Sequence, residues 1–337
     1  MVSYDILDFS VISPLGEGKP SHIDALKTAR IATQYSVGRD EVELLRDLWE
    51  PIKHHVAGIP SHRVGVVVSN SKYQFRSQSF SYETSQVLAS WVGPEAIPYN
   101  ITAACATGLV SVMTGMDWLR RGWVDVVIAG SLETSKVPLV EAAFSQMGVL
   151  SKQGSCRPFT QDRDGFVIGE GGGLFVLTRS NEGHAPLARI EKGTVMADPT
   201  DLLSVDPSGA SIASLIRQTI GTARVDYINA HGTGTRLNDA AELAAFEKVF
   251  HKDRPLISST KSQTGHLLGA TGSVELGLCL LMLSEQIFVP MIEWPDSRQR
   301  LMLGMEAFQE APTKINRLLT LNYGFGGHLA ALMIAKP

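Results

Sequence analysis

The sequence predicts an α/β fold built from two similar halves. Short apolar runs bounded by turn residues alternate with longer segments whose apolar positions recur at helical spacing, which is typical of α/β proteins. The 337 residues exceed one average domain, and the 44 % of hydrophobic residues suffice for a large core. Two stretches, 99–108 (YNITAACATG) and 255–272 (PLISSTKSQTGHLLGATG), share one layout, in which a strand leads through small or reactive residues into an apolar helix.

The expected elements follow this alternation from one end of the chain to the other. The predicted strands are continuous apolar runs, which suit strands buried on both faces, and cover residues 2–12, 63–70, 125–131, 172–178, 225–230, 255–260 and 317–324. The predicted helices cover residues 39–52, 109–122, 239–250 and 272–286. The stretch 191–209, rich in Pro, Asp and Ser, is the predicted junction between an N-terminal half (1–190) and a C-terminal half (191–337).

Composition and charge exclude several classes of protein. The formal net charge is −4 and no Lys/Arg-rich block occurs, so we expect no nucleic-acid partner. The N-terminus lacks the pattern of a signal peptide, and polar residues interrupt every apolar stretch before about 18 positions, so no membrane span is expected. Three cysteines without paired spacing indicate a reducing, cytoplasmic location rather than a disulfide framework.

One cysteine, Cys105, lies in a setting that suits a nucleophile. Most lone cysteines are small buried thiols, but small residues on both sides leave room for a substrate here. The cysteine also precedes a predicted helix, whose N-terminus favours the reactive thiolate. Cys156, in a polar loop, and Cys279, within an apolar helix, lack this setting and are expected to be structural.

Two of the nine histidines follow predicted strands. His231 and His266 each lie in a Gly- and Thr-rich loop between a strand and a helix, whereas the histidines at 22, 54, 55, 62, 184 and 251 lie in polar contexts and are expected to be exposed. A lone histidine in such a loop is more often structural. Functional loops of open α/β sheets nevertheless gather at the carboxyl ends of the strands, so Cys105, His231 and His266 are expected to share one site.

Two rival chemistries fit these residues less well. Zinc sites need closely spaced ligands, which this set lacks, and a Cys-His protease would leave the second histidine without a role. Lys261, among small or neutral neighbours, is expected to be buried with a carboxylate partner, since an unpaired buried lysine is costly. The candidates are Glu275 on the next helix and the pair after His231, Asp239 and Glu242.

Two glycine-rich stretches complete the set of candidate site segments. The stretch 157–173 (RPFTQDRDGFVIGEGGG) lacks the lysine of a phosphate-binding loop and is expected to be a structural loop of Arg–Asp pairs near the site. The stretch 324–328 (GFGGH) is a tight turn whose backbone N–H groups can supply half of an oxyanion hole.

Five motifs in this order resemble those of the β-ketoacyl-[acyl carrier protein] synthases, the decarboxylating branch of the thiolase superfamily. They are TAACATG, RPFTQDRDGFVIGEG, NAHGTGTRLNDAAE, STKSQTGHLLGATG and GFGG, and the resemblance runs from about residue 63 to the end. It implies a five-layered α-β-α-β-α fold with two pseudo-duplicated halves around buried helices. It also implies a dimer and condensation of an acyl thioester with malonyl-[acyl carrier protein].

The resemblance also implies roles for individual residues. Cys105 would accept the acyl group, and His231 and His266 would stabilise the enolate formed when CO₂ leaves malonyl thioester. Lys261 and Glu275 would set the tautomer and the electrostatic field of the histidines. Phe325 would be a gating aromatic residue, and its N–H would bind the oxyanion together with the N–H of Cys105. The implied substrate-binding residues are Thr233 and Thr235, at the pantetheine arm, and the glycines Gly326 and Gly327. No metal and no diffusible cofactor is implied, because the phosphopantetheine arrives on the acyl carrier protein.

The chain departs from the family pattern in three places. It is shorter before Cys105, where part of the cap, the acyl tunnel and some dimer contacts are expected. His328-Leu329 replaces the usual Thr-Asn after GFGG, and HGTGT is the form typical of polyketide-type synthases. Two alternatives therefore stay open: a non-condensing acyltransferase or thioesterase on the same scaffold, and a subunit of a heterodimer with a related ketosynthase rather than a homodimer.

Overall fold

The strands of the protein repeat one arrangement twice. The computed structural model describes residues 3–72, 81–180, 183–251, 254–289, 292 and 314–337. Their mixed sheet has the order β4-β3-β5-β6-β1-β7-β11-β10-β8-β9, with β2 paired to β1. The strands are β1 (Tyr4–Ser13), β2 (Gly16–Glu17), β3 (Val64–Ser69), β4 (Ile97–Tyr99), β5 (Val126–Glu133), β6 (Gly171–Arg179), β7 (Ala188–Ala197), β8 (Tyr227–Asn229), β9 (Leu256–Ser258), β10 (Arg317–Gly324) and β11 (His328–Ala335).

From each outer edge inward, the two half-sheets have the same order of strands. The first half runs β4-β3-β5-β6-β1 and the second runs β9-β8-β10-β11-β7. In each half the three outer strands are parallel to one another and the two inner ones are antiparallel to their neighbours. The half-sheets join where β1 pairs with β7. The two pseudo-duplicated halves predicted from the sequence are therefore confirmed.

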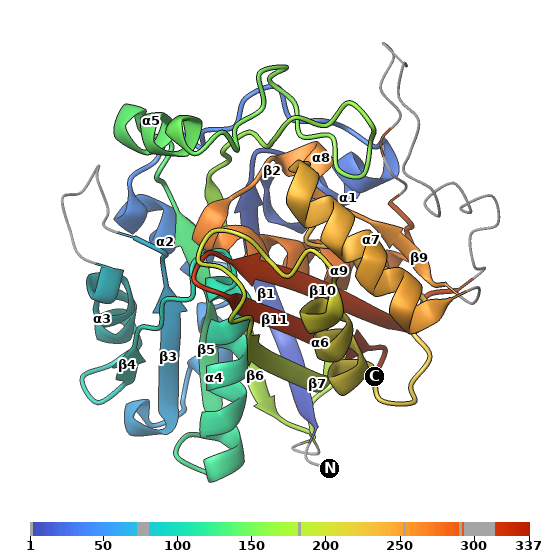
Figure 1. The fold of residues 1–337 in the computed structure, drawn as a ribbon. Coiled ribbons are helices and arrows are strands. Elements are labelled where there is room, and N and C mark those ends of the chain that lie inside the picture. Colours follow the sequence, from blue (N-terminus) through green and yellow to red (C-terminus); the bar gives the residue numbers. More distant parts are fainter. Residues whose placement is uncertain (1–2, 73–80, 181–182, 252–253, 290–291, 293–313) are drawn as a thin grey trace.

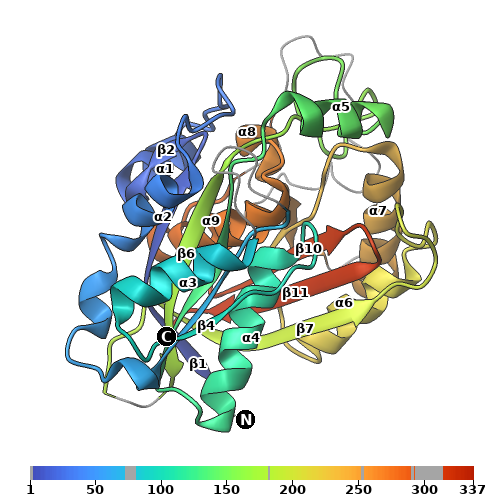
Figure 2. The same cartoon turned by 90° about the vertical axis from the view of Figure 1, so that its left-hand side faces the viewer.

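The helices form three layers around the two half-sheets. They are α1 (Gly18–Lys27), α2 (Glu41–Trp49), α3 (Ser81–Val92), α4 (Thr107–Arg121), α5 (Pro138–Gln146), α6 (Ala210–Ile220), α7 (Arg236–Phe250), α8 (Lys261–Thr264) and α9 (Thr271–Glu285). α4 and α9 pack against each other and against strands of both halves, so they form the middle layer. α2 and α3 cover the outer face of the first half-sheet, and α6 with α7 covers that of the second (Figure 1, Figure 2). The predicted α-β-α-β-α order is confirmed.

The middle helix α9 is apolar on all sides because it is buried on all sides. A window from Leu268 to Glu285 is long and apolar enough to cross a membrane, but 89 % of it lies inside the protein, as in a core helix. α4 and α9 cross at their first turns, where a Cβ added to Gly108 would lie 2.4 Å from the backbone nitrogen of Ser273. This crossing fixes the distance between the loops that precede the two helices.

Two local expectations were wrong. The stretch 191–209 is no linker, since residues 191–197 belong to β7 and pair with β11; the division of the chain at residue 190 stays a prediction. His22 is fully buried rather than exposed. Its Nδ1 lies 2.7 Å from the carbonyl oxygen of Gly18 and its Nε2 lies 2.8 Å from Ser13 Oγ, so both ring nitrogens have partners inside the fold.

Candidate active site

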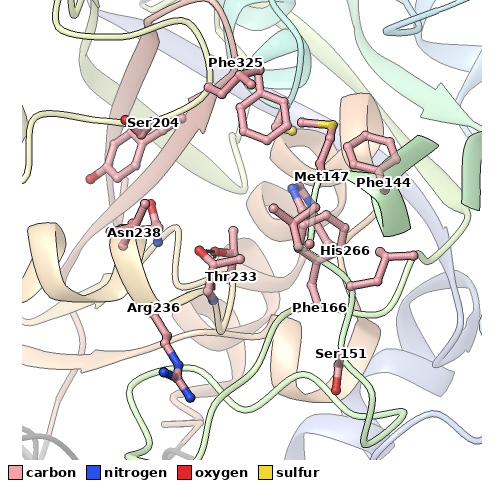
Figure 3. Close-up of a pocket in the computed structure, with 18 of the residues that line it drawn as sticks. Phe144, Met147, Ser151, Phe166, Ser204, Thr233, Arg236, Asn238, His266 and Phe325 are labelled. Carbon is pink, nitrogen blue, oxygen red and sulfur yellow. Dashed lines mark hydrogen bonds between the residues drawn. The ribbon is translucent and has the colours of Figure 1, made fainter. Parts of the chain in front are cut away.

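One pocket of about 860 Å³ brings the three predicted reactive side chains together. Cys105, His231 and His266 all line it, and the centroids of the two imidazole rings lie 5.6 Å apart. Figure 3 shows the pocket wall, to which α5, the 144–152 segment and the start of α7 also contribute. The sequence-based prediction of one shared site thus agrees with the geometry.

Cys105 lies on a tight loop directly before α4. Ala104 has a left-handed φ of 47°, which turns the chain sharply between Ala103 and the helix. A Cβ on Gly324 would lie 3.0 Å from the Cys105 nitrogen, so the turn after β10 touches the nucleophile loop backbone to backbone. This close approach places the N–H groups of Cys105 and Phe325 on neighbouring segments, as an oxyanion hole requires.

The thiol of Cys105 is less acidic than the helix terminus alone suggested. Burial raises the pKa of Cys105 to about 11, and the positive charges of Lys72 and Lys261 only partly oppose this effect. The side chain is nevertheless half-buried rather than enclosed, and it faces the pocket. The thiol is therefore protonated near neutral pH, and the nearby positive charges favour its thiolate form.

The ring of His266 is held in one tautomer by its own turn. Its Nδ1 accepts a hydrogen bond from the Leu268 N–H at 3.3 Å and lies 2.8 Å from Thr271 Oγ1. The ring proton therefore resides on Nε2, which makes His266 a hydrogen-bond donor at that atom. Burial lowers the pKa of His266 well below its usual value, so the ring is neutral. The edge of Phe166 packs on it, with ring centroids 4.8 Å apart.

His231 is fixed through its backbone. Glu242 accepts the N–H groups of His231 and Gly232 at 2.9 and 2.6 Å, and Lys261 Nζ donates to the His231 carbonyl oxygen at 2.5 Å. The ring lies beside that of Tyr323, with centroids 5.0 Å apart. Burial lowers the pKa of His231 well below its usual value, which keeps this second imidazole neutral too.

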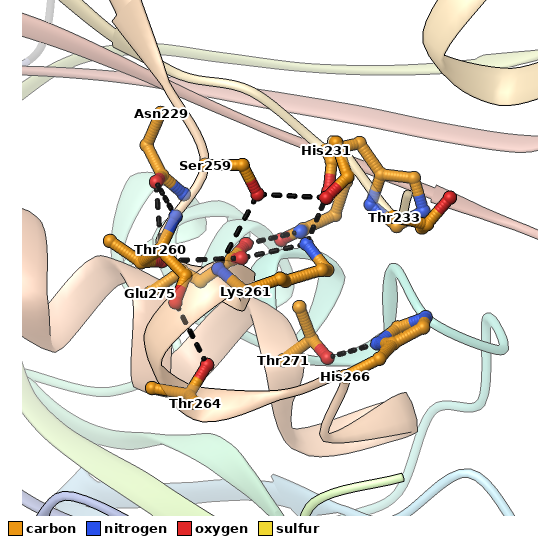
Figure 4. A network of polar contacts seen from close by, with 12 residues as sticks. Asn229, His231, Thr233, Ser259, Thr260, Lys261, Thr264, His266, Thr271 and Glu275 are labelled. Atoms are coloured by element: carbon orange, nitrogen blue, oxygen red, sulfur yellow. Dashed lines mark hydrogen bonds and ion pairs between the residues drawn. The ribbon is translucent and has the colours of Figure 1, made fainter. Parts of the chain in front are cut away.

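Lys261 and Glu275 form a buried ion pair behind the pocket wall (Figure 4). Their atoms Nζ and Oε1 lie 2.7 Å apart, and Asn322 donates to Glu275 Oε2 at 2.7 Å. The predicted partnership is present, and the charge of Lys261 lowers the pKa of both histidines, in agreement with its predicted effect on their field; the predicted effect on the tautomer is not seen at His266. Lys261 contacts the backbone of His231, whereas Thr271 and Leu268 set the tautomer of His266.

The two acidic residues after His231 serve the loops instead of the lysine. Asp239 accepts the N–H groups of Phe159 at 2.7 Å and Gly234 at 3.2 Å, and it lies 3.6 Å from Arg163. The stretch 157–173 therefore behaves as predicted, as a structural loop of Arg–Asp contacts beside the site. A second contact of this kind joins Arg157 Nη1 to an Asp162 oxygen at 3.1 Å.

The remaining predicted residues divide into two groups. Phe325 lines the pocket and stacks on Phe144 at 6.4 Å between ring centroids, and Thr233 and Thr235 line it with their hydroxyl oxygens 2.9 Å apart. Gly326 and Gly327 lie outside the pocket lining. The Gly326 N–H donates to the carbonyl oxygen of Leu202 at 2.7 Å, and the Gly327 carbonyl accepts the Asp198 N–H at 2.8 Å. These glycines thus tie the turn after β10 to residues 198–209.

Comparison with known families now places the chain. The model of the β-ketoacyl synthase N-terminal domain matches residues 57–183, and that of the β-ketoacyl synthase C-terminal domain matches residues 187–294. The chain belongs to the β-ketoacyl synthase family. The resemblance inferred from its motifs is confirmed.

Two curated relatives show the range of the family. The chain is 31 % identical over 249 residues to 3-oxoacyl-[acyl-carrier-protein] synthase 2 of Mycobacterium tuberculosis. The matched region covers 69 % of this chain and 60 % of the relative. It is 32 % identical over 263 residues to the tetracenomycin polyketide synthase ketoacyl synthase alpha subunit of Streptomyces glaucescens, which covers 73 % of this chain and 61 % of the relative. The chain thus spans about three fifths of the length of these relatives.

A solved structure supports the fold. A ketosynthase in complex with its chain length factor from Xenorhabdus doucetiae superposes with a TM-score of 0.87 at 22 % identity, covering 100 % of this chain and 98 % of the other. The thiolase-like architecture predicted for the chain is thus the fold of a chain in a solved ketosynthase complex.

Several residues of this site were not predicted. Thr271, which holds His266, sits in the HLLGAT stretch but gave no signal of its own, because its contact depends on the turn η3 (Leu268–Ala270). Phe144 and Phe166 form an aromatic row with Phe325 and were hidden among ordinary apolar positions. Outside the pocket, Asp8, His54 and His55 lie close enough to hold a metal ion, but the Lys19 ammonium group already pairs with Asp8.

Proposed function

We propose that this protein is an acyltransferase that condenses an acyl group, held as a thioester on Cys105, with malonyl-[acyl carrier protein] to give 3-oxoacyl-[acyl carrier protein] and CO₂. The observation that carries the proposal is the convergence of Cys105, His231 and His266 on one pocket. Two neutral imidazoles beside one thiol suit decarboxylation better than hydrolysis, because neither ring is paired with a carboxylate that would make it a strong base.

The first half-reaction is acyl transfer to the cysteine. The sulfur of Cys105 attacks the carbonyl carbon of the acyl carrier thioester, its proton leaves, and the carrier thiol departs after the tetrahedral intermediate collapses. The N–H groups of Cys105 and Phe325 would stabilise the oxyanion of that intermediate. Phe325, which lines the pocket and stacks on Phe144, would move with each exchange of carrier.

The second half-reaction forms the carbon–carbon bond. The Nε2–H of His266, whose position the Thr271 contact fixes, would donate to the malonyl thioester carbonyl together with His231. Loss of CO₂ leaves its bonding electrons on the α-carbon, and the two donors stabilise the resulting enolate. The α-carbon then attacks the acyl carbonyl on Cys105, and the thiolate departs. Lys261 would act as a positioning residue through the His231 carbonyl.

The partner carrying both thioesters is proposed to be an acyl carrier protein. The hydroxyl groups of Thr233 and Thr235 line the pocket and suit the amides of a pantetheine arm. The rim combines two exposed leucines, Leu203 and Leu237, with Arg236, a surface that suits a carrier with apolar and acidic side chains. Neither a resident cofactor nor a metal takes part in the proposed reaction.

A dimer is proposed through the edge strand β4. All three residues of β4 are exposed, and Ile97 and Tyr99 present apolar side chains at the end of the strand order. An exposed apolar edge of this kind favours pairing with another chain. One relative is named an alpha subunit, so the partner is either a second copy or a related ketosynthase. The three free cysteines agree with a cytoplasmic location.

Intact-protein mass spectrometry tests the proposed function. The wild-type chain, alone and with a co-expressed related ketosynthase, is mixed with a panel of acyl carriers and then with malonyl carrier. The expected result is an acyl adduct that Cys105→Ala abolishes, that the matched Cys279→Ala retains, and that malonyl carrier converts to β-ketoacyl carrier. An adduct that only hydrolyses would instead establish a thioesterase, and no adduct in either preparation would overturn the proposal.

A further inference from the structure

The duplicated topology places a loop of the first half where the second half carries His231. β3 and β8 occupy equivalent positions in the two halves. His231 follows β8 by two residues, and Ser71 and Lys72 follow β3 by two and three residues. β5 and β10 are likewise equivalent, and both are eight residues long. β10 ends at Gly324, which touches the Cys105 loop, and β5 ends at Glu133.

Direct contacts show that the loop after β3 reaches the site. The N–H of Ile101 donates to Ser69 Oγ at 3.0 Å, and Thr102 Oγ1 donates to the Asn70 carbonyl at 3.3 Å. The segment that leads into Cys105 therefore runs alongside the loop that leads into Lys72. On its other side, this loop touches the turn after His266, since a Cβ on Gly269 would lie 2.5 Å from the Cβ of Ser71.

Lys72 is held in this loop by a buried carboxylate. Its Nζ lies 3.2 Å from Oε2 of Glu133, which is fully buried, and donates to Ser71 Oγ at 2.7 Å. Ser71 Oγ donates to the same carboxylate oxygen at 2.5 Å. The proposed reaction uses the Lys261–Glu275 pair but gives this second lysine–glutamate pair no role.

We propose that Lys72 is a positioning residue for the Cys105 nucleophile: its ammonium group, anchored by Glu133, supplies positive charge that favours the thiolate during acyl transfer. The proposal rests on the proposed role of Cys105 as the nucleophile. The proposal adds a residue to that role, because the positive charge of Lys72 comes from the loop after β3, which is equivalent to the loop after β8 that carries His231. The site is thus flanked by two lysine–glutamate ion pairs, one from each half: Lys261–Glu275 is fully buried, and Lys72–Glu133 has a buried carboxylate and a partly exposed ammonium group.

The electrostatics of the site agree with this arrangement. Among the charges that act on Cys105, Lys72 lowers the pKa of the thiol most, ahead of Lys261, while Glu133 and Glu275 raise it. Lys72 also lowers the pKa of His266, as expected for a cation near both groups. The other titratable groups that line the pocket with the thiol are Lys152, Asp164, His231, Arg236, His266 and Tyr323.

The test is the pH profile of Cys105 alkylation by iodoacetamide, followed by intact-protein mass spectrometry. Only the thiolate reacts, and no carrier protein is needed, so the result does not depend on whether the protein condenses thioesters. In Lys72→Met we expect the midpoint to rise by about half a pH unit or more, which slows alkylation at pH 8 about threefold or more. Lys72→Arg should keep the wild-type midpoint, and Glu133→Gln should lower it.

A matched control separates local charge from general charge. Lys136 has a side chain of similar exposure, 29 % against 24 % for Lys72, and also lies near a glutamate, so Lys136→Met should leave the profile unchanged. An unchanged midpoint in Lys72→Met, or a shift of Lys72→Met and Glu133→Gln in the same direction, would show that the pair is only structural. If Lys72→Met does not fold, a Glu133→Gln midpoint that fails to fall overturns the proposal by itself.

Discussion

The Lys261–Glu275 ion pair supports a quantitative stability prediction. Lys261 and Glu275 are 0 % and 1 % exposed, and their charged atoms lie 2.7 Å apart. The variants are Lys261→Met, Glu275→Leu and the double substitution. Each single variant leaves one charge inside the protein without its counter-ion, whereas the double variant leaves none.

The magnitude follows from the burial of both groups. Breaking a buried pair by removing one partner costs about 3–5 kcal/mol of unfolding free energy. Glu275→Leu also leaves Asn322 Nδ2 without the carboxylate that it contacts at 2.7 Å, so its loss is expected at the upper end of that range. The double variant should lose less than the sum of the single losses by about 2 kcal/mol or more, because partners in contact are coupled.

The assay is urea unfolding followed by circular dichroism, with the slope m compared between variants. The coupling energy is obtained from the four unfolding free energies of the double-mutant cycle. Single variants within about 1 kcal/mol of the wild type, or losses that simply add, would refute the reasoning. In that case water or local rearrangement would have to solvate the remaining charge.

Three further predictions concern separate features. Thr271→Val removes a hydrogen bond of about 1 kcal/mol from His266, so single-turnover assays should show malonyl decarboxylation slowed about fivefold. Acylation should be unchanged, and Thr271→Ser, which keeps the hydroxyl group, is the control. Burial lowers the pKa of His22 to about 4 in the folded state, so between pH 6.5 and pH 4 the unfolded state binds a proton that the folded state does not. The free energy of unfolding should therefore fall as the pH is lowered from 6.5 to 4, and urea unfolding should show a smaller fall in His22→Gln. Gly108→Ala should destabilise the protein by about 1–3 kcal/mol in thermal unfolding, rather than give the usual gain of a helical Gly→Ala change, because its Cβ would meet Ser273.

The sequence located most of the buried strands and the helices α2, α4, α7 and α9, but not β4, β7, β11 or the helices α1, α3, α5 and α6. Continuous apolar runs identify strands that are buried on both faces, and the predicted strand 317–324 coincides with β10. Reactive residues at strand ends must then meet, because parallel neighbours end at one edge of the sheet. His231 and His266 follow this rule, because β8 and β9 are parallel neighbours. Cys105 follows β4 at the other end of the strand order, and the crossing of α4 and α9 brings its loop to the histidines.

Side-chain packing could not be predicted in the same way. His22 lies among Lys, Pro, Ser and Asp in the sequence, yet its ring is buried because β1 and α1 fold back on each other and offer it Ser13 and Gly18. The acidity of Cys105 was misjudged for a related reason. The helix terminus is visible in the sequence, whereas the burial that raises the thiol's pKa depends on distant segments.

The duplication explains why a thiol and an imidazole from opposite halves form one site. α4 follows β4 and α9 follows β9, the two strands at the equivalent outer edges of the half-sheets. These helices form the middle layer. Their first turns cross at Gly108 and Ser273, and Ser131 Oγ lies 2.8 Å from Ser273 Oγ at the same point. The loops before the two helices therefore converge whatever residues they carry, and divergence placed Cys105 on one and His266 on the other. Any substitution that separates the helices at this crossing should move Cys105 away from His266 before it disturbs either residue's own loop.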